Sequence, residues 1–218
     1  MSDGPLVMLD IGSTLVAGPD QGPARRIAVE IGLSAEEKRA LHRALMTIPF
    51  GSPSAVSAFV RDELGRSGDA AIERVWAEQE GEAEPIDGAL EALERLSVGG
   101  VRFAIVSNIW QPFFDSARRH LGRFIDENVP PDLQLLSFRT GVAKPAPEIF
   151  ERALDAAGVG AADAVMVGDS YEKDIEPARA LGIGTIQIGT DVRSVADVGL
   201  DLVYAAIDRG GVHAHPRA

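Results

Sequence analysis

The chain has 218 residues, 45% of them hydrophobic, which is enough to bury the core of one domain that carries a smaller insertion. Its formal net charge of −12 disfavours nonspecific binding to nucleic acid or to an anionic membrane. The sequence has no cysteine, which excludes disulfides and thiolate metal sites, and no apolar run approaches the ~20 residues that span a bilayer. We therefore expect a cytoplasmic protein, a monomer or homodimer, that binds neither nucleic acid nor membranes.

The first 84 residues predict one strand followed by a helical segment. The apolar run at 5–9 reads as a buried strand that ends at Asp10. Residues 16–84 are rich in Ala, Arg and Glu and show no convincing strand. Ser34 and Glu37 form a capping-box pattern at the start of the second helix. The expected helices are Ala24–Ile31, Ala35–Met46, Ser54–Leu64 and Ala70–Gln79.

From Pro85 onward, strand and helix patterns alternate. We expect strands at 101–106, 133–138, 164–167 and 183–188, with a last short one near 202–204. The expected helices are 87–96, 113–121, 147–157 and 175–181. This alternation predicts an α/β fold, a doubly wound (Rossmann-like) parallel sheet with a helical insertion after the first strand. We assign 1–15 and 85–209 to the α/β core, 16–84 to a helical cap, and 210–218 to a flexible tail.

Three predicted strands end in polar residues, namely Asp10, Ser107 and Asp169. Ligands of open α/β sheets bind at the carboxyl ends of the strands. The pattern therefore predicts that these side chains meet at one edge of the sheet.

These residue types suit phosphoryl transfer. A carboxylate such as Asp10 can attack phosphorus and form an aspartyl-phosphate. Ser107 and the backbone N–H groups beside it can hold phosphate oxygens, and Lys144 can place a point charge near the phosphate and the nucleophile. Asp169 and Asp174 supply the oxygen ligands that Mg²⁺ prefers. Mg²⁺ is therefore the expected cofactor.

Four segments, in order, resemble the motifs of the haloacid dehalogenase-like hydrolase superfamily: Asp10 to Leu15, Val106 to Asn108, Lys144-Pro145, and Gly168 through Ile175. The resemblance covers the whole chain and implies a phosphatase-like member with a mobile helical cap (C1-type), acting on a small phosphorylated metabolite. It implies that Mg²⁺ is held by Asp10, the main-chain carbonyl of Gly12 and Asp169, with Asp174 as a close or alternative ligand. It also implies that phosphate is bound by Thr14, Ser107, Asn108 and Lys144.

The sequence departs from this family at one position. Phosphatases of the family usually carry a second aspartate two residues after the nucleophile, which protonates the leaving group and then activates water; this chain has Gly12 there. Acid–base help of this kind is worth ~10²–10⁴-fold. We expect slow turnover, a substrate with a good leaving group, or an acid/base from elsewhere. Ser13 is too weak a base for that role, and His42 in the cap is one conceivable replacement.

Other readings stay open. A catalytically impaired protein would keep phosphate and Mg²⁺ affinity without turnover. A relative that cleaves carbon–phosphorus bonds would need a cap lysine, and Lys38 is the only one in the insertion. A carbon–halogen cleaving relative would need no metal.

Some side chains have plainer readings. Trp110, Phe113 and Phe114 are expected to pack in the core or at the cap interface. His213 and His215 fall in the predicted tail and indicate a metal only by residue type.

Overall fold

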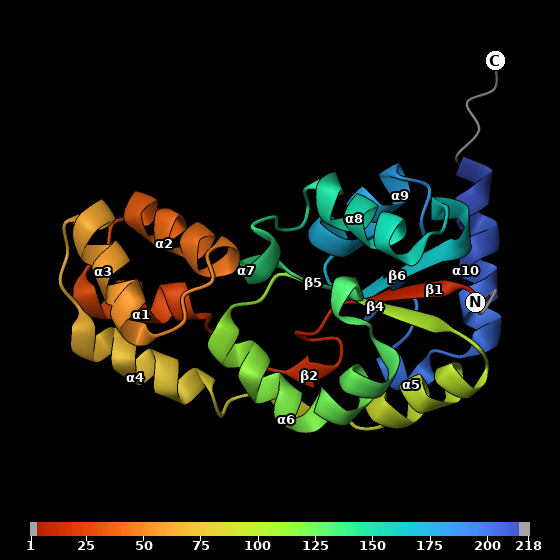
Figure 1. The fold of residues 1–218 in the computed structure, drawn as a ribbon, viewed down its shortest axis with the longest axis horizontal. Helices are drawn as coiled ribbons and strands as arrows, with labels where there is room; N and C mark the ends of the chain where they lie inside the picture. Colours follow the sequence, from red (N-terminus) through yellow and green to blue (C-terminus); the bar gives the residue numbers. More distant parts are fainter. Residues whose placement is uncertain (1–3, 214–218) are drawn as a thin grey trace, which may run out of the picture.

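The computed structural model describes residues 4–213. Five parallel strands form the central sheet in the order β5-β4-β1-β6-β7 (Figure 1). Their bounds are Leu6–Leu9 for β1, Arg102–Ser107 for β4, Gln134–Leu136 for β5, Ala164–Gly168 for β6 and Gly184–Gln187 for β7. The predicted doubly wound α/β sheet is confirmed.

The central strand β1 is buried on both faces because each of its four residues is apolar. Leu9 lies opposite Ile105 of β4 on one side and opposite Val167 of β6 on the other. The carboxyl ends of β1, β4 and β6 therefore reach the same edge of the sheet.

Helices cover both faces of this sheet (Figure 1). On one face lie α5 (Ala89–Val98) and α6 (Gln111–Asn128), and on the other α8 (Pro147–Ala157) and α9 (Glu176–Ala180). The helix α10 (Leu200–His213) packs against β7. No helix in residues 4–213 is both long enough and apolar enough to cross a bilayer.

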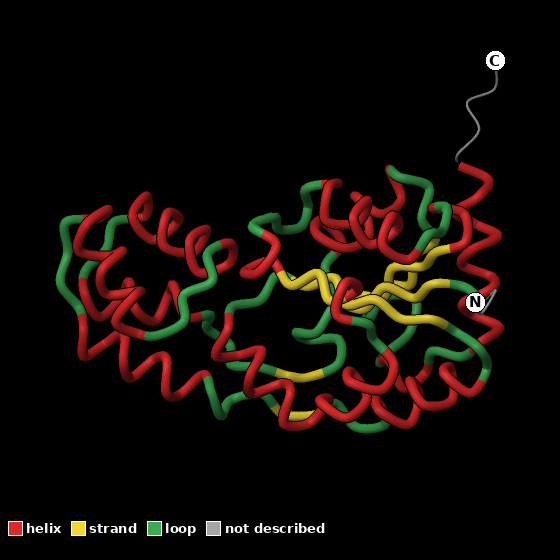
Figure 2. The backbone as a smooth tube through the Cα atoms, viewed as in Figure 1, coloured by secondary structure: helices red, strands yellow, loops and turns green. Residues whose placement is uncertain are grey.

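Four helices form a separate bundle at one end of the molecule (Figure 2). They are α1 (Pro23–Ile31), α2 (Ala35–Thr47), α3 (Pro53–Leu64) and α4 (Asp69–Gln79). Their buried side chains make a hydrophobic cluster distinct from that of the sheet. The predicted capping box is confirmed, because Ser34 Oγ accepts from the Glu37 N–H while the Glu37 carboxylate accepts from the Ser34 N–H.

A two-stranded ribbon joins this bundle to the sheet, where the sequence showed no convincing strand. Strand β2 (Val16–Ala17) pairs antiparallel with β3 (Glu84–Pro85). Strands of two residues carry too little alternation to be seen in a sequence.

Two predicted strands are wrong in whole or in part. The segment near 202–204 lies inside α10, because Val203, Ala206 and Gly210 are buried at helical spacing. Strand β5 ends at Leu136, and the short helix α7 (Ser137–Thr140) follows it. Residues 210–213 of the predicted tail continue α10, and 214–218 lie outside the described residues.

Candidate active site

Two acidic side chains stand at the carboxyl ends of neighbouring strands. Asp10 directly follows β1, and its backbone N–H donates to the Val167 carbonyl at 3.0 Å, which ties it to β6. Asp169 directly follows Gly168, the last residue of β6. Because β1 and β6 pair in parallel register, the two carboxylates emerge at the same edge.

Lys144 joins Asp10 to a third carboxylate. Its Nζ donates to Asp10 Oδ1 at 2.9 Å and to Asp174 Oδ1 at 2.5 Å. The side chains of Lys144 and Asp174 are each 1% exposed, and that of Asp10 is 12% exposed. Charges removed from water to this extent are tolerated only when they are paired with good geometry. We call Asp10, Lys144 and Asp174 the acid–lysine cluster.

Asn108 fixes the main chain of Lys144. Its Nδ2 donates to the Lys144 carbonyl and its Oδ1 accepts from the Lys144 N–H, both at 2.7 Å. Both ends of the amide are therefore committed to the backbone of Lys144. The geometry gives Asn108 a positioning role at this loop, and its contact with phosphate stays a prediction.

A short π-helical turn, η3 (Tyr171–Ile175), carries Asp174 back toward the sheet. Its second carboxylate oxygen, Oδ2, accepts from the Ser170 N–H at 2.9 Å. A Cβ at Gly168 would overlap this carboxylate, so the close approach requires glycine there. Both oxygens of Asp174 are thus engaged within the protein.

The charges in the site shift the pKa values of its members. Burial lowers the pKa of Lys144, but the charges of Asp10 and Asp174 outweigh burial and hold that pKa above its ordinary value. Burial raises the pKa of Asp174, the Lys144 ammonium opposes the rise, and the Asp10 charge adds to it. Burial and then the Asp10 charge raise the pKa of Asp169. Three carboxylates stand against one ammonium here, so this edge carries an excess of negative charge.

The donor set fits Mg²⁺. Asp10, Asp169 and Asp174 each offer an oxygen, and these atoms lie within 4.8 Å of one another. Oxygen ligands are those that Mg²⁺ prefers, and a divalent cation would relieve the excess negative charge. Asp169 is exposed, and no other side chain among residues 4–213 pairs with its carboxylate, whereas Asp174 is occupied by Lys144 and Ser170. Asp10 and Asp169 are therefore the freer ligands.

Two buried hydroxyls near these strand ends have no hydrogen-bond partner among the described residues. They are Oγ1 of Thr14, which follows the Asp10 turn, and Oγ of Ser107, which ends β4. Buried hydroxyls are normally satisfied, so each of these two has room for a further partner, such as a water or a ligand atom. A phosphate oxygen is an acceptor that either hydroxyl can serve.

Ser137 is a site residue that the sequence analysis missed. Its buried Oγ accepts from the Ile109 N–H at 3.1 Å and donates to the Ile109 carbonyl at 3.2 Å. It thereby shapes the loop that follows Ser107. In the sequence, Ser137 is a polar residue that directly follows a strand, which is the signal that could have found it. The predicted strand ran to residue 138 and placed Ser137 inside it, whereas β5 ends at Leu136.

A cavity of about 200 Å³ lies between the helical bundle and the site. The backbone of Gly12 and Ser13 forms part of its wall, together with the side chains of Gln79 and Asn108. Most of the remaining lining is apolar, including Met46, Trp110, Ile109 and Phe113. A Cβ at Gly12 would meet nothing within 4 Å, so open space replaces the missing second aspartate.

Among the residues whose side chains the structure describes, the other lysines and histidines that the sequence analysis singled out do not line this cavity. Lys38 is exposed on α2 and does not line the cavity. His42, also on α2, is near enough to the η3 turn for the Lys173 charge to act on it: partial burial and then that charge lower the pKa of His42. The side chain of His213 and all of His215 lie outside the described part of the chain.

The aromatic residues after Ser107 pack as expected. Trp110 is buried in the bundle's cluster and Phe114 in that of the sheet, while Phe113 contacts both. Trp110 Nε1 donates to Gln79 Oε1 at 2.8 Å, and its ring meets that of Trp76 edge-on at 5.4 Å.

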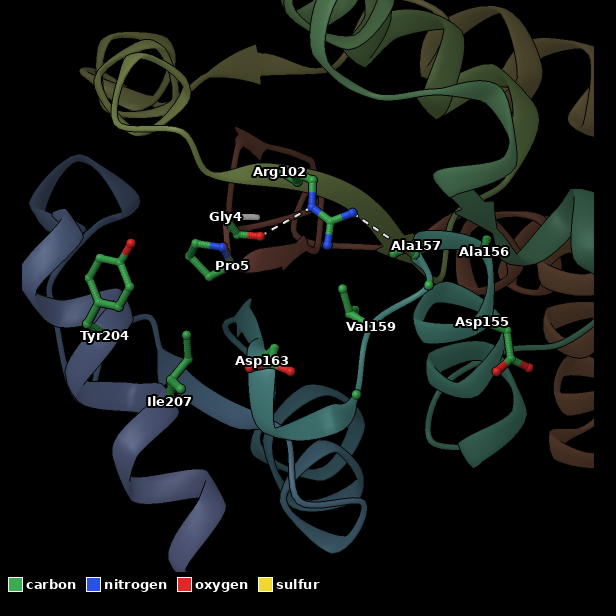
Figure 3. Close-up of a pocket in the computed structure, with 12 residues that line it drawn as sticks. Gly4, Pro5, Arg102, Asp155, Ala156, Ala157, Val159, Asp163, Tyr204 and Ile207 are labelled. Atoms are coloured by element: carbon green, nitrogen blue, oxygen red, sulfur yellow. Dashed lines mark hydrogen bonds between the residues drawn. The ribbon is translucent and has the colours of Figure 1, made fainter. Parts of the chain in front are cut away.

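A second hollow, of about 660 Å³, is at the opposite end of the sheet (Figure 3). It lies beside Pro5, Arg102 and Asp163, which stand at the amino ends of β1, β4 and β6. Arg102 donates there to the carbonyls of Gly4 and Ala157, which is a structural use of its guanidinium. This hollow is remote from the acid–lysine cluster.

A doubly wound parallel sheet with carboxylates and a lysine gathered at its carboxyl edge fits the class of α/β hydrolases that bind their ligands at the strand ends. The haloacid dehalogenase-like hydrolase family matches residues 6–182. The chain belongs to this family.

Several curated relatives are phosphatases. Ribulose-1,5-bisphosphate 5-phosphatase of Halopiger xanaduensis is 34% identical over 151 residues, which is 68% of this chain and 61% of that protein. Phosphoserine phosphatase of Thermus thermophilus is 33% identical over 95 residues, 36% of this chain and 38% of that protein. The matches thus span less than two thirds of either relative.

Solved structures share the fold. A family enzyme of Bacteroides thetaiotaomicron, in complex with magnesium, superposes with a TM-score of 0.63 at 18% identity, covering 92% of this chain and 98% of that one. A phosphatase of Thermococcus onnurineus gives a TM-score of 0.57 at 19% identity, covering 88% and 94%.

Proposed function

We propose that this protein is a Mg²⁺-dependent phosphohydrolase that cleaves a small-molecule phosphate ester through an aspartyl-phosphate on Asp10. The observation that carries the proposal is the ion pair between buried Lys144 and Asp10 Oδ1, made beside two further carboxylates. The phosphatase relatives support the same reaction class.

Asp10 acts as the nucleophile. Lys144 engages Oδ1 and leaves Oδ2 without a hydrogen-bond partner among the described residues, so Oδ2 is free to approach phosphorus. The Lys144 ammonium, whose pKa is raised by the two carboxylates, stays protonated and offsets charge on the transferring phosphoryl group. Asp174, engaged by Lys144 and Ser170, orients the lysine.

Mg²⁺ would be held by Asp10, the Gly12 carbonyl and Asp169, with Asp174 as the alternative ligand. Asp169 is favoured over Asp174 because its carboxylate is exposed and Asp174 already has two partners. When bound, the ion supplies charge neutralisation between the carboxylate nucleophile and an anionic phosphate. Ser107 and Thr14 would donate their unpaired hydroxyls to phosphate oxygens.

The test is hydrolysis of a phosphomonoester panel with and without Mg²⁺. We expect activity that requires Mg²⁺ and is lost in Asp10→Asn and Asp169→Asn. Asp155→Asn, at the opposite end of the sheet, is the matched control and should keep wild-type activity. The proposal fails if Asp10→Asn remains active, or if no phosphomonoester in a broad panel is hydrolysed.

Because Gly12 stands where the family's phosphatases carry their acid/base aspartate, a second candidate function is that of a catalytically impaired protein that binds phosphate and Mg²⁺. A turnover assay, run beside thermal denaturation, distinguishes the two functions. Inorganic phosphate with Mg²⁺ would raise Tm in both cases, whereas multiple turnovers occur only in a phosphohydrolase. The carbon–phosphorus reading has less support, because Lys38 is exposed and does not line the cavity beside Gly12.

A further inference from the structure

The cavity beside Gly12 provides no acid for a departing group. Its twelve lining residues, all in the described part of the chain, include no Asp, Glu, His, Lys or Arg. Of its polar side chains, Asn108 is committed to the Lys144 backbone. Gln79 is committed to Trp110 and Glu82. The Ser13 hydroxyl is the polar side chain that remains, and it is too weak an acid for the task.

The chemistry of the leaving group follows from this lining. An alkoxide is about as basic as hydroxide, whose parent water has a pKa of 15.7, so it needs a proton as the P–O bond breaks. A carboxylate, with a pKa of roughly 4, needs none at neutral pH. A leaving-group cavity without a proton donor therefore discriminates strongly in favour of carboxylate leaving groups.

The size and polarity of the cavity narrow the leaving group further. A volume of about 200 Å³ is below the ~300–1,000 Å³ of ordinary ligand pockets. Its walls are largely apolar, with Met46, Trp110 and Phe113 among them, and no lining cation could receive a second phosphate. The group that occupies it is small and carries no charge of its own beyond the scissile end.

We propose that the preferred substrates are acyl phosphates, mixed anhydrides of phosphate with a small, otherwise uncharged carboxylic acid; this rests on the proposed function above. An Asp10 oxygen bonds to phosphorus as the P–O bond to the acyl group breaks, and the acid leaves as its carboxylate without taking a proton. Water then bonds to phosphorus, the Asp10–phosphorus bond breaks, and the water's proton passes to solvent with inorganic phosphate.

The experiment compares benzoyl phosphate with benzyl phosphate, which share a ring and differ in the leaving group. The value of kcat/KM reports the first, phosphoryl-transferring step. Wild-type enzyme with Mg²⁺ should have a higher kcat/KM for benzoyl phosphate than for benzyl phosphate. The ratio of these two values should fall at least ~10²-fold in Gly12→Asp, because a general acid that helps only the benzyl ester is worth ~10²–10⁴-fold. Asp10→Asn supplies the background rate of the anhydride.

Two matched variants isolate the acid. The open space at Gly12, whose φ is not left-handed, admits a side chain. Gly12→Asn adds the same bulk without a titrating group and should leave the wild-type ratio unchanged. His42→Ala should also leave it unchanged, because His42 does not line the cavity. A selective loss of benzyl phosphate turnover in His42→Ala would overturn the proposal, since the cap histidine would then be the proton donor.

A series of substituted phenyl phosphates tests the wild-type enzyme without any variant. We expect log kcat/KM to fall steeply as the leaving phenol becomes less acidic. A flat dependence, or an equal preference in wild type and Gly12→Asp, contradicts the acyl-phosphate proposal and leaves the phosphohydrolase intact. Failure of the wild-type enzyme both to hydrolyse benzoyl phosphate above the Asp10→Asn background and to show a phosphorylated Asp10 by intact mass counts against the proposed function itself.

Discussion

Lys144 balances two buried carboxylates, so the integrity of the site depends on this one side chain. Removing one partner of a buried ion pair leaves uncompensated charge and costs ~3–5 kcal/mol. We expect Lys144→Met to lower the free energy of unfolding by about that amount in denaturant titrations. Lys38→Met, which removes an exposed lysine, is the matched control and should stay within ~0.5 kcal/mol of wild type.

A double-mutant cycle separates charge from packing at this position. Lys144→Met leaves the carboxylates of Asp10 and Asp174 without their cation, and the double variant Lys144→Met/Asp174→Asn removes the second of these two charges as well. The double variant should be more stable than the sum of the single losses indicates, by a coupling of ~0.5–3 kcal/mol. Strict additivity would show that Lys144 and Asp174 do not stabilise each other.

Individual site residues were predictable only where the sequence carries a local signal. Asp10, Ser107 and Asp169 each end an apolar strand, so parallel topology alone predicts that they converge. The roles of Asn108 and Asp174 toward Lys144 were not predictable, since both depend on contacts across at least 30 positions of sequence. Local patterns contain no information about such pairings.

The start of α2 combines several interactions on one carboxylate. A hydrogen bond from Arg66, followed by those from the backbone and side chain of Ser34, lowers the pKa of Glu37 from 4.5 to about 2. A carboxyl whose folded-state pKa is lowered stabilises the fold above its ordinary pKa. This contribution is lost as the pH falls from about 4.5 toward 2.

An NMR titration of the Glu37 side chain checks this assignment. We expect a midpoint near 2 in wild type. In Arg66→Met the midpoint should move back toward the ordinary value, because Arg66 is the largest cause of the shift. A smaller rise is expected in Ser34→Ala. An unchanged midpoint in Arg66→Met would show that the arginine does not pair with Glu37 in solution.

Whole elements were predicted best where an apolar pattern was long. The helices of the bundle and α8 match their expected ranges to within a residue or two. The short segments 133–138 and 202–204 were misjudged because an apolar run of a few residues fits a strand and a buried helical turn equally well. Tertiary burial, which the sequence does not display, decides between them.

Trp110 couples the two hydrophobic clusters of the molecule. It is on the loop after β4, yet its ring is buried in the bundle's cluster and its Nε1 is bonded to Gln79 at the end of α4. The two parts should therefore unfold together while this side chain is present.

Replacing Trp110 should uncouple them. We expect Trp110→Ala to cost ~3–5 kcal/mol, the usual range for a buried tryptophan. The variant keeps Trp76 of α4 as its one tryptophan, and its fluorescence should change at lower denaturant than the circular dichroism of the whole chain. Val29→Ala, at a position 74% exposed, is the control and should leave both transitions coincident. Coincident transitions in Trp110→Ala would refute the coupling.

The β2–β3 ribbon has a consequence for how such a molecule can be altered. Because Val16 lies opposite Pro85 and Ala17 opposite Glu84, the chain leaves for the bundle and returns at adjacent points. A different helical segment inserted between these two strands would only have to bring its two ends to the same neighbouring positions. The entropic cost of closing such a loop rises only slowly with its length. The ribbon therefore marks a natural junction at which the helical bundle could be exchanged for another segment while the central sheet is left in place.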